Sequence, residues 1–108
     1  MSSECTYTLG VLITFDPSKN ARNMRERNLP FESAREFEFE KALVYADTRH
    51  NYGETRYIAL GPLRGRLHVL CFTATPDGIR VFSLRKADDR EVKRYAKNQR
   101  DAERKATD

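Results

Sequence analysis

Residues 55–85 read TRYIALGPLRGRLHVLCFTATPDGIRVFSLR, and this stretch decides the fold. It contains three runs of strand length that are rich in β-branched and aromatic residues: 55–61, 66–75 and 79–85. The segment 62–65 has the composition of a turn, and Pro76-Asp77-Gly78 is a strong turn signal. Because strands joined by tight turns lie antiparallel, the stretch predicts an antiparallel sheet.

The N-terminal part predicts a further strand followed by a helix. Residues 9–15 form a short, partly β-branched apolar run. Asp16 can cap a helix whose first residue is Pro17, and Asn28 suits the left-handed position after a helix that ends near Arg27. The apolar residues of this helix are few, mainly Ala21 and Met24.

Between this helix and the central strands, the sequence predicts a second short helix and another strand. Phe31, Ala34 and Phe37 recur at three-residue spacing, which favours a helical turn with one buried side. Residues 42–47 are strand-like, and 48–53 form a polar loop.

The chain closes with a predicted helix. Asp88 and Glu91 have the spacing of a capping box, and the apolar side carries Val92, Tyr95 and Ala96. Beyond Asn98 the sequence is charged and has little to pack, so this part is expected to fray.

These elements predict one α+β domain over residues 1–108, with an ordered core at about 9–98. The expected architecture is an antiparallel sheet of about four to five strands with two N-terminal helices and one C-terminal helix. A chain of 108 residues and 12.6 kDa has the size of a single domain, which excludes repeat arrays and multidomain enzymes.

The sequence also limits the possible cellular locations of the protein and the cofactors that it could bind. No apolar run approaches membrane-spanning length and the first residues do not resemble a signal peptide, so a soluble, cytoplasmic protein is expected. Cys5 and Cys71 are therefore expected to be free thiols. We find neither zinc-ligand spacing nor a phosphate-binding glycine loop, and we expect no metal and no other cofactor.

The charge is unevenly distributed. The net charge is +4, but residues 31–47 carry −3 (five acids, two bases) and residues 49–86 carry +5 (seven bases, two acids). A basic segment of this kind favours an anionic partner, either a nucleic acid or an acidic protein. The plainer alternative is a solvated surface.

Metal-free RNA cleavage requires a base for the 2′-hydroxyl, cations for the phosphate and an acid for the leaving oxygen. Arginine suits the phosphate because its planar fork binds two oxygens. The candidate catalytic residues are Glu54 as base or orienting group, Arg56, Arg80 and Arg85 on the phosphate, and Tyr95 as acid or stacking group. The candidate RNA-binding residues are Arg49, His50, His68 and Lys86. Each of these residues also has a structural interpretation; Tyr95, for example, can be a core aromatic residue. The residues alone therefore support a basic α+β domain and leave RNA binding open.

Four collinear stretches resemble the BrnT toxin family: 15–23, 31–34, 53–61 and 79–87, the last followed by Glu91 and Tyr95. The resemblance implies a fold similar to the RelE-type toxins and a metal-independent endoribonuclease that blocks translation. It also implies a type II toxin–antitoxin system whose antitoxin is BrnA-like and carries a ribbon-helix-helix region. Two toxins would join two antitoxins, and promoter DNA would be bound only through the antitoxin.

The chain departs from the family pattern at two places. Glu26-Arg27-Asn28 stands where many members have Lys-His-Gly, and many members carry a histidine near Phe72. Two other functions therefore stay open beside the RNA-cleaving toxin. One is a non-catalytic module that binds nucleic acid or an antitoxin, and the other is a small interaction protein without a nucleic-acid role.

Overall fold

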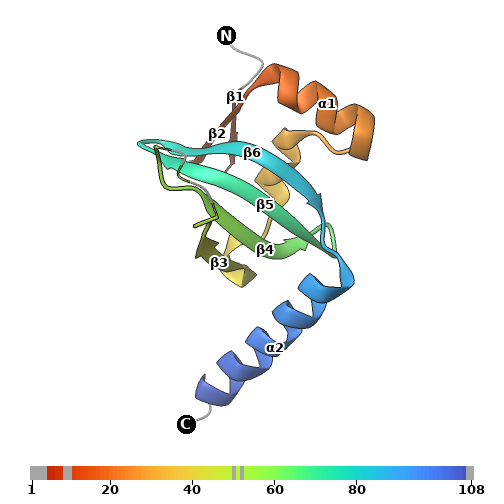
Figure 1. The fold of residues 1–108 in the computed structure, drawn as a ribbon, viewed down its shortest axis with the longest axis vertical. Helices are drawn as coiled ribbons and strands as arrows, with labels where there is room; N and C mark the ends of the chain where they lie inside the picture. The colour runs from red at the N-terminus through yellow and green to blue at the C-terminus, as the bar shows by residue number, and fades with distance from the viewer. Residues whose placement is uncertain (1–4, 9–10, 50, 52, 107–108) are drawn as a thin grey trace.

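The computed structural model describes residues 5–8, 11–49, 51 and 53–106. They form an α+β domain in which six strands make one sheet, in the order β1-β2-β6-β5-β4-β3 (Figure 1). The strands are β1 (Cys5–Thr8), β2 (Val11–Phe15), β3 (Leu43–Ala46), β4 (Tyr57–Leu63), β5 (Arg66–Thr75) and β6 (Gly78–Lys86). The helices are α1 (Pro17–Arg27), α2 (Asp89–Ala106) and the 3₁₀ segments η1 (Phe31–Glu36) and η2 (Phe39–Lys41).

The two central hairpins confirm the prediction from residues 55–85. Strands β4 and β5 are antiparallel and are joined at Arg64 and Gly65, which have φ of 52° and 78°. Strands β5 and β6 are also antiparallel and turn at 76–77. Pro62, which was expected in the first turn, instead lies within β4 opposite Leu67.

The prediction of an antiparallel sheet with four to five strands was wrong in two respects. Strand β2 pairs in parallel with β6, from Leu12 opposite Gly78 to Phe15 opposite Val81, so the sheet is mixed. Strand β1 adds a sixth member at the edge. A Cβ at Gly78 would lie 2.0 Å from the Leu12 carbonyl oxygen, so this close approach of the two strands requires glycine.

Helix α1 has the predicted bounds and caps, but it docks differently from the prediction. Asp16 accepts a hydrogen bond from the Ser18 amide, and Asn28 adopts the left-handed conformation. The expected apolar residues Ala21 and Met24 are exposed. The buried residue is Asn23, whose amide donates to the backbone oxygens of Leu29 and Leu84. Asn23 thus gives a hydrogen bond to a backbone carbonyl of β6 that lies beyond the last residue paired with β2.

The second N-terminal helix is a 3₁₀ helix, which corrects the prediction of two N-terminal helices. Phe31, Ala34 and Phe37 are all at most 5% exposed. Their strict three-residue spacing fits three residues per turn, so a 3₁₀ segment aligns them on one side better than an α-helix does. The structure therefore agrees with the expected RelE-like fold only in being an α+β domain built on one sheet.

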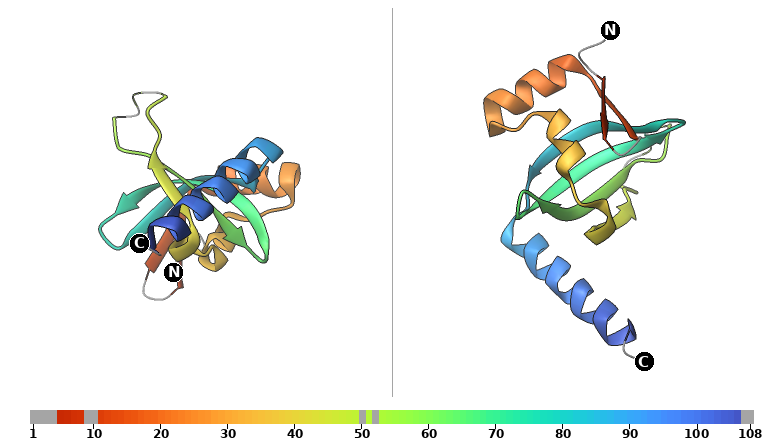
Figure 2. Two further views of the ribbon diagram at one scale, coloured as in Figure 1. Left: turned by 90° about the horizontal axis from the view of Figure 1, so that it is seen from below. Right: turned by 180° about the vertical axis from the view of Figure 1, so that it is seen from behind.

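The two faces of the sheet are unequal. One face packs against η1 and forms the main core, which includes Ile13, Phe31, Leu70 and Leu84 (Figure 2). The opposite face carries a smaller cluster built on Ile58, Leu60 and Val69. We call this second side the open face, because its remaining area is not covered by η1 or α1.

Helix α2 begins with the predicted capping box and then projects away from the sheet (Figures 1 and 2). The Glu91 amide donates to Asp88, and the Asp88 amide donates to the Glu91 carboxylate. The helix continues to Ala106, past the expected limit of the ordered core, and fraying beyond Asn98 stays a prediction. None of the helices in the described residues has the length and apolar character needed to cross a membrane.

Candidate functional site

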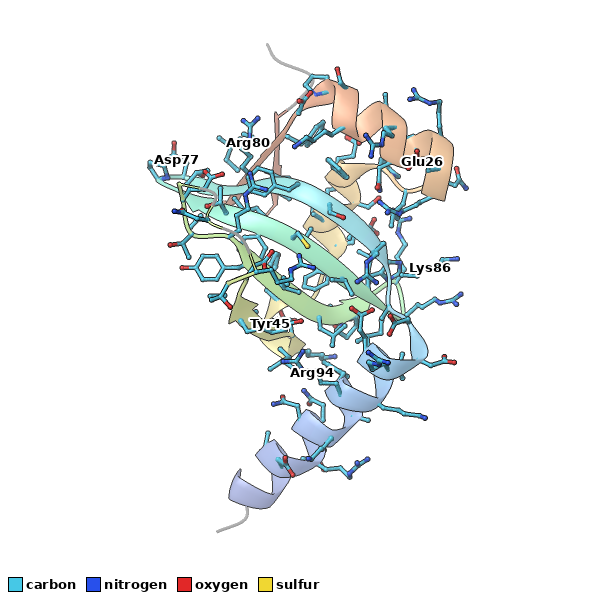
Figure 3. The ribbon with its side chains drawn as sticks, in the orientation of Figure 1. Glu26, Tyr45, Asp77, Arg80, Lys86 and Arg94 are labelled. Atoms are coloured by element: carbon cyan, nitrogen blue, oxygen red, sulfur yellow. The ribbon has the colours of Figure 1, made fainter. Side chains whose placement is uncertain are left out.

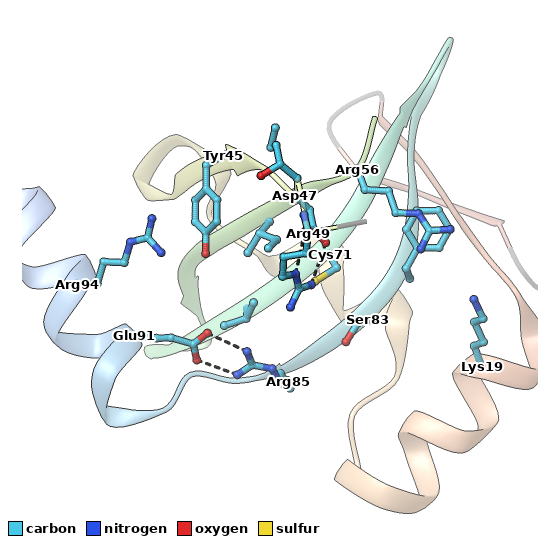
Figure 4. Close-up of a pocket in the computed structure, with 15 residues that line it drawn as sticks. Lys19, Tyr45, Asp47, Arg49, Arg56, Cys71, Ser83, Arg85, Glu91 and Arg94 are labelled. Atoms are coloured by element: carbon cyan, nitrogen blue, oxygen red, sulfur yellow. Dashed lines mark hydrogen bonds and ion pairs between the residues drawn. The ribbon is translucent and has the colours of Figure 1, made fainter. Parts of the chain in front are cut away.

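A pocket of about 600 Å³ opens on the open face of the sheet (Figure 4). Its floor comes from strands β4, β5 and β6, and one wall comes from β3 and the residues that follow it. Glu91 and Arg94 of α2 close one end, and Lys19 of α1 stands at the other. These elements are far apart in the sequence, so only the assembled sheet brings them together.

The floor follows from the strand register. Ile58 pairs with Cys71 and Cys71 pairs with Ser83, so these three residues form one row across the sheet. Val69, two residues before Cys71 on β5, pairs with Arg85 and so belongs to the next row on the same face. Side chains of one row share a face of a pleated sheet, which places Arg85 in the pocket rather than in the main core.

Cationic groups dominate the lining. Five basic side chains face two acidic ones, Asp47 and Glu91, which gives a formal charge of +3 (5 − 2). The basic residues are Lys19, Arg49, Arg56, Arg85 and Arg94. A concave surface with one dominant sign of charge attracts anions, so the pocket suits a phosphate-bearing ligand.

Arg85 is held in place by Glu91. Its two terminal nitrogens donate to the two carboxylate oxygens of Glu91, each at 2.8 Å. The capping box fixes Glu91 in the first turn of α2, so one carboxylate orients both the helix and the arginine. The hydrogen bonds from Arg85 lower the pKa of Glu91 and outweigh its partial burial, and the pKa of Arg85 is raised in return.

A bulge in β6 brings Phe82 into the pocket. The pairing passes from Cys71–Ser83 to Phe72–Val81, so Phe82 is the extra residue on its strand. The Arg56 guanidinium lies over the Phe82 ring at 3.9 Å from its centroid, and the Lys19 amine is 5.6 Å from it. The ring thus positions two cations by cation–π contact.

Arg56 also has a carboxylate partner. Glu54, which precedes β4, lies 3.3 Å from the Arg56 guanidinium. At the rim of the pocket, Arg49 forms a similar two-point pair with Asp47, at 2.8 and 2.9 Å. Each of these two arginines is therefore oriented by an acidic neighbour two residues away.

The structure brings only part of the predicted site together. Arg49, Arg56 and Arg85 all line the pocket, and Glu54 contacts it through Arg56. Arg80 is exposed near the β5–β6 turn, and Lys86 lies at the opposite end of β6 (Figure 3). Neither lines the pocket.

Of the two predicted histidines, His68 does not line the pocket. His68 is 5% exposed and its Nδ1 lies 2.8 Å from the Arg66 carbonyl oxygen. Burial lowers its pKa, which favours a neutral ring held inside the fold. An RNA contact by His68 stays a prediction. His50 lies outside the described residues.

Tyr95 contacts another part of the molecule. Its hydroxyl donates to the Lys41 carbonyl oxygen at 2.7 Å, and its ring packs against the cluster of Ile58, Leu60 and Val69. It does not line the pocket. This arrangement matches the structural alternative, in which Tyr95 docks α2 onto the sheet.

Several pocket residues were missed by sequence reasoning. Lys19, Tyr45 and Arg94 come from three different elements, and Arg94 lies over the Tyr45 ring at 4.4 Å. No local spacing links such residues. Glu91 was recognised as a capping residue, but its contact with Arg85 depends on the angle between β6 and α2.

The remaining questions about the site are the state of the Cys71 thiol and the presence of metal ligands. Cys71 is a free cysteine on the pocket floor, and burial raises the pKa of its thiol despite the nearby Arg49 and Arg85. The thiol form is therefore favoured at neutral pH. For Cys5, the expected free thiol stays a prediction. Among the side chains that the structure describes, no three His, Cys, Asp or Glu residues gather as a metal site would require.

Comparison with protein families gives a match over residues 15–91, more than half of the chain. The matching family is described as "Ribonuclease toxin, BrnT, of type II toxin-antitoxin system". The chain belongs to the BrnT family. The BrnT match includes every pocket residue except Arg94, and it ends at Glu91. No protein with a curated description matches the chain.

Proposed function

We propose that this BrnT-family chain is a metal-independent endoribonuclease that cleaves RNA in the cation-lined pocket. The observation that carries the proposal is the convergence of Arg49, Arg56 and Arg85 on one pocket from three separate segments. Arginine forks recognise phosphate oxygens in pairs, and arginine stays charged at all physiological pH values.

The chemistry that such a site favours is an internal transfer at phosphorus. The 2′-hydroxyl of the RNA gives up its proton and its oxygen bonds to the adjacent phosphorus. The bond from phosphorus to the 5′-oxygen breaks, and that oxygen takes up a proton. The products are a 2′,3′-cyclic phosphate and a 5′-hydroxyl, and the charge that builds on the phosphate oxygens is stabilised by the arginines.

The contacts support different roles for the predicted residues. We assign Arg56 and Arg85 to the phosphate, because both line the pocket and each is oriented by a carboxylate. For Glu54, its contact with Arg56 favours the orienting role over the role of base. We expect Arg80 to contact RNA outside the pocket and Tyr95 to dock α2 onto the sheet.

Cleavage by the purified protein tests this proposal. We expect cleavage to persist in EDTA and to fall by about 10²–10³ in Arg85→Ala, the usual effect of removing one preorganised donor. Arg100→Ala, an exposed position on α2, is the matched control and should cleave as wild type does. A requirement for added magnesium in metal-stripped protein would contradict the metal-free mechanism.

A second candidate is a non-catalytic toxin relative that only binds nucleic acid or an antitoxin. The observation that favours it is that three pocket arginines already contact carboxylates: Arg49 with Asp47, Arg56 with Glu54 and Arg85 with Glu91. Such pairing reduces the charge available to a phosphate. Purified protein that binds RNA but leaves it intact in all metal conditions would support this candidate.

As a member of a type II toxin–antitoxin family, the chain is expected to have an antitoxin partner. We propose a BrnA-like antitoxin with a ribbon-helix-helix region, two copies of each chain per complex, and promoter binding through the antitoxin alone. The toxin would inhibit translation in the cytoplasm. If the antitoxin covers the open face, the complex loses RNA binding that the free toxin has, whereas a complex that cuts RNA equally well must be inhibited elsewhere.

A further inference from the structure

A second hollow lies beside the pocket, between α1 and β6. It measures about 230 Å³ and shares Lys19, Phe82 and Ser83 with the larger pocket. The two hollows are therefore contiguous, and the Phe82 ring, with Arg56 over it, belongs to the boundary between them. We call the smaller one the α1 hollow.

The α1 hollow is also basic. Lys19, Arg22 and Arg27 line it against a single acid, Glu26, which gives a formal charge of +2 (3 − 1). Arg22 and Glu26 lie 3.6 Å apart, and both side chains are more than half exposed. Solvent screens such a pair strongly, so Glu26 reduces the attraction for an anion only in part.

One cation of the α1 hollow is anchored from inside the protein. Asn23 is 3% exposed, and its amide nitrogen donates to Leu29 and Leu84. Its remaining polar atom, Oδ1, accepts a hydrogen bond of 2.6 Å from Arg27. The same buried side chain thus docks α1 and fixes the Arg27 guanidinium, which lowers the entropy lost when an anion binds there.

We infer that the α1 hollow binds a second phosphate of the RNA strand whose neighbouring phosphate occupies the larger pocket. The inference rests on the proposed function, because it places the same ligand in both hollows. An isolated anion site would not need to be continuous with the larger pocket. A single strand needs a continuous basic path past an aromatic ring, and Lys19, Phe82 and Arg56 provide this path.

Length-dependent RNA binding tests the inference. The probes are a dinucleotide, which carries one internal phosphate, and a six-nucleotide RNA, both methylated at every 2′-oxygen so that they cannot be cleaved. The test variant is Arg22→Ala combined with Arg27→Gln, and the matched control is Lys97→Ala combined with Arg100→Ala on exposed parts of α2. Both variants remove two positive charges, so they separate local contacts from net charge.

We expect the test variant to bind the six-nucleotide RNA about tenfold more weakly, as expected for lost hydrogen bonds to a charged group. Its salt dependence should fall by about 0.7 in slope, which corresponds to one phosphate contact on a single strand. Dinucleotide binding should not change, and the control should resemble wild type with both probes. Arg22→Ala alone, at an exposed site, should show part of the same effect without disturbing Asn23.

The outcomes separate this inference from the proposed function. Suppose that wild type binds RNA, but the test variant loses affinity equally for both probes or loses none for either. That result would overturn the second phosphate site and leave RNA binding in the main pocket intact. If wild type binds neither probe, the proposed function and the inference both fail.

Discussion

Replacing Glu91 tests whether one carboxylate holds both helix α2 and Arg85. Glu91→Ala removes the two-point pair with Arg85 and one half of the capping box. Glu91→Gln keeps an oxygen that can accept from the Asp88 amide, but it loses the charge. The pair of variants therefore separates the contribution of the cap from that of the ion pair.

The expected magnitudes follow from exposure. The Arg85 side chain is 37% exposed, so screening limits the ion pair to about 0.5–1 kcal/mol of unfolding free energy. The lost cap contributes about 1 kcal/mol more. We expect Glu91→Ala to lower the free energy of unfolding by about 1.5–2 kcal/mol and Glu91→Gln by about 0.5–1 kcal/mol. In a domain of this size, 1 kcal/mol shifts Tm by roughly 4–8 °C.

Urea unfolding at several pH values is the assay, with Glu103→Gln on the exposed part of α2 as control. Arg85 holds the pKa of Glu91 below its usual value of 4.5, so the ion pair stabilises the fold fully above that pH. Its contribution is lost as the pH falls through the lowered pKa, and there wild type and Glu91→Gln should converge. Equal losses in Glu91→Gln and Glu91→Ala, or a constant difference at all pH values, would refute this reasoning.

Three further predictions concern the site and its support. Arg80→Ala should leave cleavage within a few-fold of wild type while Arg85→Ala nearly abolishes it; the reverse order in a cleavage assay would move the site toward the β5–β6 turn. Burial lowers the pKa of His68 below 6.5, so the unfolded chain binds the proton more readily than the folded protein does. The free energy of unfolding should therefore fall as the pH drops from about 6.5 through that lowered pKa. His68→Gln should flatten this part of the stability profile, and an unchanged profile would contradict the prediction. Tyr95→Ala should lower the free energy of unfolding by about 2 kcal/mol, whereas Tyr95→Phe should still cleave RNA. Truncation after Asn98 should barely change Tm. Loss of cleavage in Tyr95→Phe at unchanged Tm would make the hydroxyl catalytic.

Part of the site could be predicted from residue type and strand position. The preference of phosphate for arginine forks predicts Arg56 and Arg85 as site residues, and both line the pocket. The same preference predicts Arg80, and the bulge at Phe82 brings Arg80 to the same face of the sheet as Arg85. Arg80 nevertheless lies outside the pocket, because it is close to the β5–β6 turn. A bulge depends on pairing with another strand, so the sequence of β6 alone does not reveal it.

The sequence by itself determined the local features of this protein. The caps at Asp16 and Asp88, the left-handed Asn28 and the two central hairpins depend on contacts within a few residues. All of them are present, although Pro62 lies in β4 rather than in the predicted turn. The family resemblance is also a property of the sequence, and the match over residues 15–91 confirms it.

The tertiary structure alone decided how these parts meet. The parallel pairing of β2 with β6, the docking of α1 through Asn23 and the clamp between Glu91 and Arg85 join residues through packing rather than through local spacing. Turn signals define only the order of strands that follow one another directly, and hydrophobic periodicity does not reveal a buried amide. The cation-lined pocket exists because the assembled sheet brings six separate segments to one face, and no single segment carries its pattern.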